Sequence, residues 1–453
     1  MTSEDTVTTA ADTPADAVAH AADTPRMILS VGSAAFLVYF CMYAFRKPFT
    51  VGLFDEVDVW GFDYKIILIL AQVLGYACSK FIGITVISAM LKRQRAFMIL
   101  GLVAASELAL LGFALVDAPY NIVFLFLNGL PLGMIWGVVF SYIEGRRTTE
   151  LLAVILSSSF IMSSGITKSV GKYLMVNMQV SEYWMPFATG ALFILPMMFA
   201  VWWLEQTPVV SVEDQLLRHK REPMSGEDRR TLFFGIWPGM IALVVMYFIL
   251  TAFRDYRDNF AADIWSEIGM AQNVRVFAET EIIIAVISLG LMASLFFVRN
   301  NILAVKLVLL LMIAGLVLLG AGTYFYQAQI LKAPFVWMVL IGLGAYVAYI
   351  PMGSILFERI IASLRYRSNA GFLIYIADTA GYAGSILLLL YKELFFHEVS
   401  VMEFFIVFSY ATSGVGIVSL LFCYRYFDLQ LRASAGQDEA ALMAQAATQT
   451  ATV

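Results

Sequence analysis

Two arginines occupy matching places in two similar apolar runs. Arg46 ends a run that begins at Tyr39, and Arg254 ends a run that begins at Tyr247; a phenylalanine directly precedes each arginine. A guanidinium inside a membrane-spanning segment is costly, so an arginine there usually marks a functional site. Because its planar fork binds a carboxylate or a phosphate through two hydrogen bonds, the pair predicts a site for a small anion. The repetition also predicts that this site lies between two related halves of the chain.

Further cations within the apolar runs extend the predicted site. The expected substrate-binding residues are Tyr43, Arg46, Lys47, Lys80, Lys168 and Arg254. Lys168 is expected to face a cavity, because a lysine in contact with lipid would have to reach far to the membrane surface. Two alternatives remain open. Arg46 and Lys47 could snorkel to the surface from the end of the first helix, and Lys80 could pair with an acid that cancels its cost of burial.

The acidic residues in the apolar runs are candidates for proton coupling or for ion pairs. These are Glu107, Glu281 and Asp378. Glu107 is interpreted chiefly as a structural hydrogen-bond partner. For Asp378 the two roles are not ranked: it either carries a proton or pairs with Lys80 or Lys168.

Charged residues also end two later runs, one in each half. We predict that they form salt bridges between helices at a cytoplasmic gate. The residues are Glu144, Arg146, Glu358 and Arg359.

The composition indicates an integral membrane protein. Of the 453 residues, 60% are hydrophobic and only 14% are charged, and the mean hydropathy is +0.80. The net charge of −5 argues against a nucleic-acid partner. The three cysteines lie in apolar runs, and the sequence shows no histidine cluster, nucleotide-binding loop or nucleophile motif. We therefore predict a non-enzymatic protein without a metal or a cofactor.

The apolar runs approach or exceed the ~20 residues that a helix needs to cross a bilayer. We predict twelve membrane helices near residues 28–54, 64–90, 96–116, 120–143, 150–174, 184–204, 234–258, 275–298, 301–326, 333–357, 368–391 and 401–426. The first is expected to continue past Pro48 with a kink, which would place Arg46 about 6 Å beyond its centre.

One long hydrophilic interruption separates the first six runs from the last six. The predicted fold is therefore an all-α polytopic membrane protein whose two six-helix halves are related by pseudo-two-fold symmetry. The predicted segments are a disordered N-terminal tail (1–26), the first bundle (27–204), a central loop (205–233), the second bundle (234–428) and a disordered C-terminal tail (429–453).

Loop charges predict the orientation. With a cytoplasmic N-terminus, the inner loops carry most of the lysines and arginines, and the outer loops carry only isolated ones such as Lys332 and Lys392. We predict that both termini, the central loop and both tails are cytoplasmic. The expected location is a bacterial inner or plasma membrane, and the expected state is a monomer.

Two motifs resemble a known family. The run from Met42 to Phe49 resembles the Tyr-x-x-Arg-Lys-x-Phe signature in the first helix of the organophosphate:phosphate antiporters, a branch of the major facilitator superfamily. The run from Gln72 to Gly83 is similar to their second helix. The resemblance implies a major facilitator fold and places Arg254 where those carriers hold a second phosphate-binding arginine.

Two departures from the family pattern bear on the substrate. The loop after Gly83 lacks the usual aspartate of the superfamily, and helix 5 lacks the family's histidine. The substrate therefore need not be an organophosphate.

Together these features favour a secondary transporter that moves a small organic anion, phosphorylated or carboxylated, by alternating access. The alternative is a transporter-like membrane sensor that binds a similar anion without turnover. Flux across a vesicle membrane distinguishes the two.

Overall fold

The computed structural model describes residues 25–54, 58–59, 61–88, 90–144, 146, 148–208, 226–364 and 370–450, and these residues are mostly helical. The long helices are α2 (Pro25–Met42), α3 (Tyr64–Ser88), α4 (Arg95–Leu115), α5 (Ile122–Ile143), α6 (Thr149–Met178), α7 (Met185–Glu205), α9 (Gly226–Asn259), α11 (Val276–Phe296), α12 (Asn301–Gln327), α13 (Pro334–Pro351), α15 (Ala370–Phe395) and α16 (Val401–Thr450).

Shorter elements join the long helices. They are the 3-10 turns η1 (Tyr43–Phe45), η2 (Pro48–Val51) and η3 (Lys92–Gln94), the π turn η4 (Met352–Leu356), and the helices α10 (Ala261–Glu267) and α14 (Phe357–Leu364). Strand β1 (Asp58–Val59) pairs antiparallel with β2 (Phe62–Asp63) in a small hairpin directly before α3.

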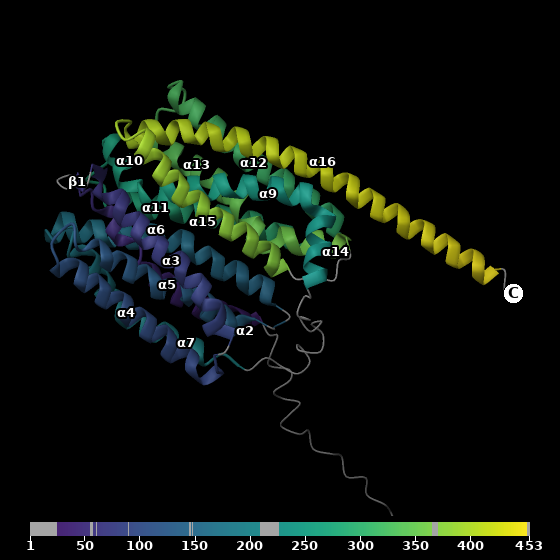
Figure 1. Ribbon diagram of the computed structural model, residues 1–453, viewed down its shortest axis with the longest axis horizontal. Helices are drawn as coiled ribbons and strands as arrows, with labels where there is room; N and C mark the ends of the chain where they lie inside the picture. The colour runs from purple at the N-terminus through teal and green to yellow at the C-terminus, as the bar shows by residue number, and fades with distance from the viewer. Residues whose placement is uncertain are drawn as a thin grey trace, which may run out of the picture.

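The helices form one elongated bundle. In Figure 1, α2 to α7, coloured purple to blue, lie together along one side, and α9 to α16, coloured teal to yellow, lie along the other. Contacts between α6 and α11 and between α3 and α15 join the two groups.

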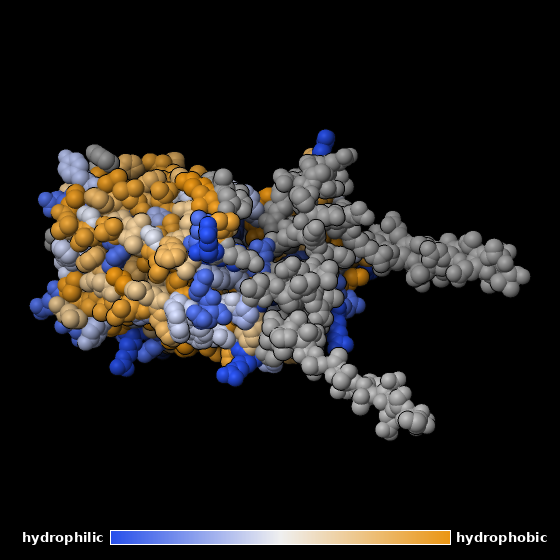
Figure 2. All heavy atoms as spheres, turned by 90° about the horizontal axis from the view of Figure 1, so that it is seen from below, coloured by the Kyte–Doolittle hydropathy of each residue, from blue (hydrophilic) through white to orange (hydrophobic). Residues whose placement is uncertain are grey.

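The outer surface is apolar over much of the bundle. Figure 2 shows a broad band of hydrophobic residues, with hydrophilic residues gathered mainly toward its ends. Among the described residues, eleven helices are long and apolar enough to cross a membrane. The predicted span 64–90 corresponds to α3, which is not one of these eleven, so twelve spans remain a prediction.

The prediction for the first helix was wrong. The α-helix ends at Met42, and the chain continues through η1 and η2 rather than as a kinked α-helix. Pro48 has no N–H to donate, so an α-helix that continued through it would lose a backbone hydrogen bond. Arg46 and Lys47 therefore lie in an unwound segment between the two turns.

The prediction of a disordered C-terminal tail also differs from the structure. α16 continues past residue 428 to Thr450 and projects from the bundle (Figure 1). The segment after Asp428 is rich in alanine, glutamine and leucine, which have high helix propensity. Residues 1–24 of the predicted N-terminal tail and residues 209–225 of the predicted central loop lie outside the described residues.

The orientation yields a direct test. A cysteine at Ser225 in the predicted inner loop should react with a membrane-impermeant maleimide only from the cytoplasmic side. A cysteine at Ile330, which is exposed between α12 and α13, should react only from the outside. Labelling of the two positions in the opposite sense would overturn the predicted topology.

Candidate functional site

The break after α2 is stabilised by side chains from three other helices. Asn128 on α5 donates to the carbonyl of Phe45 at 2.9 Å, and Gln72 on α3 donates to the carbonyl of Arg46 at 2.9 Å. Gln72 also donates to Asn128 at 2.7 Å, and Asn128 donates to Ser106 on α4 at 2.6 Å. Unwinding frees backbone carbonyls that water cannot reach inside a membrane, and this brace of Gln72, Ser106 and Asn128 satisfies two of them.

Close packing of α3 against α5 positions the brace. Gly129 lies against the backbone carbonyl of Gln72, and a methyl group there would clash with it. Gly75 approaches the carbonyl of Phe126 in the same way. Small residues that let helix backbones approach are typical of membrane helix interfaces. The brace is not evident from the sequence, because neither amide is a charged residue and the contacts are remote along the chain.

The guanidinium of Arg46 lies against aromatic rings. Its Cζ atom is 3.9 Å from the ring centre of Tyr76 and 5.9 Å from that of Tyr43. Its Nε atom is buried without a hydrogen-bond partner, and among the described residues no carboxylate lies within 4.0 Å of the guanidinium. Its neighbour Lys47 is buried inside the bundle, where its ammonium group contacts Asp258.

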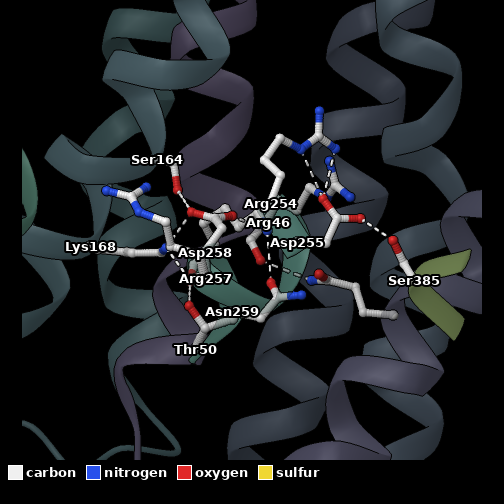
Figure 3. Close-up of polar contacts among 12 residues, drawn as sticks. Arg46, Thr50, Ser164, Lys168, Arg254, Asp255, Arg257, Asp258, Asn259 and Ser385 are labelled. Atoms are coloured by element: carbon white, nitrogen blue, oxygen red, sulfur yellow. Dashed lines mark hydrogen bonds and ion pairs between the residues drawn. The ribbon is translucent and has the colours of Figure 1, made fainter. Parts of the chain in front are cut away.

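The end of α9 directs charged side chains toward three different helices. Asp255 accepts hydrogen bonds from Arg254 at 2.7 Å and from Ser385 on α15 at 2.7 Å. Arg257 pairs with Glu281 on α11 at 2.7 Å. Because successive helical residues are rotated by about 100°, neighbours in this short run face different parts of the bundle. Figure 3 shows Asp255 toward Ser385.

Asp258 connects α9 to the helices that precede it. Its carboxylate pairs with Lys47, at the break after α2, and with Lys168 on α6 at 2.5 Å. Ser164 on α6 donates to the same carboxylate at 2.5 Å (Figure 3). Lys47 also donates to the side chain of Asn259 at 2.8 Å. Two buried lysines therefore share one carboxylate.

These residues form what we call the central charge cluster. It consists of Arg46, Lys47, Lys168, Arg254, Asp255, Arg257, Asp258 and Glu281. Five cations and three carboxylates leave two positive charges in excess. Inside a low-dielectric bundle such an excess attracts an anion.

A second charged pair lies between α3 and α15. Lys80 is 3.4 Å from Asp378, and the hydroxyl of Tyr247 donates to the same carboxylate at 2.9 Å. Lys80 also lies 4.4 Å from the ring centre of Tyr382. Both charged side chains keep about 30% of their surface exposed, so the pair faces accessible space.

Aromatic contacts connect this pair with the two arginines. Tyr76 packs against Tyr382 at 5.8 Å between ring centres, and Tyr247 stacks on Tyr349 at 4.9 Å. The Cζ atom of Arg254 is 4.0 Å from the ring centre of Tyr349. Each arginine thus lies on a tyrosine from another helix, which fixes the plane of its guanidinium.

Glu107 differs from the other two predicted acids. It is buried on α4 against Gly190 of α7, and neither carboxylate oxygen has a hydrogen-bond partner among the described residues. The interpretation as a structural hydrogen-bond partner is therefore wrong for this conformation. Burial of an unpaired carboxylate is costly.

The four predicted gate residues lie directly after α5 and in the first turn of α14. Arg146 donates to the carbonyls of Tyr142 and Pro208, and Arg359 donates to Asn301 at 2.6 Å. Glu144 follows the last residue of α5, and Glu358 lies in the first turn of α14. Their role as a gate remains a prediction.

Asp255 and Asp258 were not among the predicted site residues. The predicted seventh membrane helix ends near residue 258. A carboxylate close to the end of a membrane helix can reach water, so its presence there costs little and does not by itself indicate a functional site. Arg254 and Asp258 are four residues apart and share a helix face, so their spacing predicts an ion pair between them. In the structure Arg254 instead pairs with Asp255, and Asp258 pairs with the two lysines.

The brace makes a prediction about stability. Replacing Asn128 by alanine should leave the carbonyl of Phe45 buried and unpaired, which costs about 1–3 kcal/mol. The purified variant should unfold at a lower temperature than the unmodified protein. Asn301→Ala, which removes an amide that contacts Arg359 near the end of the bundle, should have a smaller effect. Equal melting temperatures for the two variants would contradict a special role for the break.

Comparison with solved structures identifies the fold. A D-xylose–proton symporter matches with a TM-score of 0.57 and 13% identity over 88% of this chain and 97% of its own. A mutant peptide transporter of the POT family in complex with sulfate gives a TM-score of 0.61 and 12% identity over 93% and 99%. The human organic anion transporter MFSD10 (TETRAN) gives 0.54 and 13% over 88% and 100%.

These proteins are transporters of the major facilitator type, so the chain has a major facilitator-like fold and is an integral multi-pass membrane protein. No curated protein sequence matches the chain. The organophosphate:phosphate branch remains a prediction. A family model does match residues 48–430, which is most of the sequence, and the chain therefore belongs to DUF5690, a family of unknown function.

Proposed function

We propose that the protein is a secondary transporter that moves a small organic anion across the membrane by alternating access. The observation that carries this proposal is the state of Arg46. A guanidinium is held at a helix break inside the bundle and packed on Tyr76, and among the described residues no carboxylate lies within 4.0 Å of it. A substrate anion would supply the missing negative charge.

The surroundings of Arg46 support the same substrate class. The central charge cluster has two positive charges in excess. In this proposal Arg46 and Arg254 bind the anionic group, with Tyr43 and Lys47 beside them. Lys80 and Lys168 strengthen the positive field.

The ion pairs that cross the bundle suit a mechanism in which contacts break and form again. Lys47 and Lys168 meet Asp258, and Lys65 at the start of α3 meets Asp263 on α10 at 2.6 Å. Burial raises the pKa of Asp263, and the Lys65 ammonium opposes that rise. The pairing therefore offsets only part of the cost of burying Asp263. We propose that α2–α7 and α9–α16 rock against each other here.

Two of the structural neighbours are associated with anions. Sulfate is bound in the POT complex, and the human neighbour is an organic anion transporter. Both facts concern those proteins, and they support the proposal only because they indicate that this fold accommodates anions. The competing hypothesis of a membrane sensor predicts the same binding site but no flux.

Uptake into proteoliposomes tests the proposal. Purified protein should exchange at least one labelled member of a panel of phosphorylated and carboxylated metabolites across the vesicle membrane. Binding of a panel member without any flux would favour the sensor, and neither binding nor flux would reject both.

The Arg46→Lys variant tests whether the guanidinium of Arg46 binds the substrate. The variant keeps the charge but loses the planar two-point contact and the stacking on Tyr76, so affinity should fall at least about tenfold. Arg254→Lys should behave alike. The matched control is Arg432→Lys, because Arg432 is an exposed residue that pairs with Asp428 at 2.9 Å. Unchanged apparent affinity in both central variants would remove the two arginines from the site.

A further inference from the structure

The carboxylate of Asp258 is bound as a small-molecule anion would be. Lys47 contacts Oδ2, while Lys168 and Ser164 each contact Oδ1 at a distance of 2.5 Å. Both lysines are almost fully buried. Two ammonium groups and one hydroxyl thus contact the two oxygens of a planar carboxylate. Figure 3 shows Lys168 and Ser164 beside this carboxylate.

The donors and the acceptor come from different parts of the bundle. Lys47 follows α2, and Lys168 and Ser164 lie on α6, whereas Asp258 belongs to α9. If α9 moved away from α6, the two lysines would remain buried beside each other without a counter-charge. Leaving buried charges unpaired is strongly destabilising. The separation therefore requires another anion in the place of Asp258.

We infer that Lys47, Lys168 and Ser164 form a binding site for a carboxylate group of the substrate, and that Asp258 occupies this site in the present conformation. The inference rests on the proposed transport of an organic anion and selects the carboxylated class. The substrate carboxylate displaces Asp258, and the displacement releases the connection between α6 and α9.

The space around Asp258 favours a carboxylate over a phosphate. The cavity beside it, lined by residues that include Lys168, Arg257 and Glu281, has a volume of about 10 Å³, which is room for about one water molecule. A tetrahedral phosphate would bring additional oxygens and negative charge toward Glu281. A carboxylate reproduces the contacts already made by Asp258.

Anion binding to purified protein tests the inference, with acetate and inorganic phosphate as probes. Asp258→Asn removes the internal negative charge but keeps the shape of the side chain, so it should bind acetate at least tenfold more tightly than the unmodified protein. Asp428→Asn is the matched control. It also removes one carboxylate that pairs with a lysine, Lys306 at 2.5 Å, but lies outside the site and should leave acetate binding unchanged.

A double variant tests whether the increased acetate affinity depends on Lys168. Adding Lys168→Met to Asp258→Asn should abolish the increased acetate affinity. The inference is overturned if Asp258→Asn binds acetate no more tightly than Asp428→Asn, or if its affinity for phosphate rises as much as that for acetate.

A second measurement leaves Asp258 in place, in case its replacement prevents folding. Ala261 lines the cavity and is buried. Ala261→Cys, with the exposed Cys78 replaced by serine, should react with maleimide several-fold faster in acetate than in chloride of equal ionic strength. An equal rate in the two salts contradicts displacement of Asp258.

Failure of this inference is distinguishable from failure of the proposed function. Organic-anion flux in vesicles without a gain in acetate affinity in Asp258→Asn rejects the carboxylate site and keeps transport. A gain in acetate affinity without any flux keeps the site and rejects transport.

Discussion

The structure depends on the way a broken helix is accommodated inside a membrane. Without water, each backbone carbonyl freed by unwinding must find a donor within the protein. Asn128 and Gln72 supply these donors for Phe45 and Arg46. Their position requires α3 and α5 to pack backbone to backbone, which Gly75 and Gly129 allow. The unwound segment in turn presents Arg46 and Lys47 to the centre of the bundle instead of continuing the face of an α-helix.

The charged residues at the centre are under the same constraint, because their partners must also come from within the protein. Each buried cation must be paired or must remain costly. Arg254 and Arg257 find carboxylates on or near their own helix, and Lys47 and Lys168 share Asp258. Among the described residues, the guanidinium of Arg46 is offered only the faces of two tyrosines. A cation–π contact brings no ionised group to the guanidinium, so in the described part of the chain the positive charge of Arg46 has no counter-ion within contact distance.

In the proposed mechanism, the carboxylate that two lysines share couples anion binding to the conformation of the bundle. In the mechanism that we propose, Asp258 keeps α6 and α9 connected until a substrate anion takes its place on the lysines. Such an arrangement suits an anion transporter, because binding of the substrate to the lysines would offset the cost of breaking their contact with Asp258. The pair of Lys80 and Asp378 lacks this property, since one cation and one carboxylate balance each other and both remain partly exposed.

The sequence by itself determined the class of the protein and its principal cations. Long apolar runs can satisfy their backbone only as helices in a bilayer, so most helix positions follow from hydropathy. An arginine inside such a run is conspicuous for its cost, which is why Arg46 and Arg254 are recognisable from the sequence alone. Only the tertiary structure decided which charges neutralise each other. Asp258 meets Lys47 and Lys168 from distant parts of the chain, and the amides at the break carry no charge that a hydropathy pattern reveals. Pairing depends on helix rotation and on the residue at which each helix ends, and a one-residue change in either turns a side chain by about 100°.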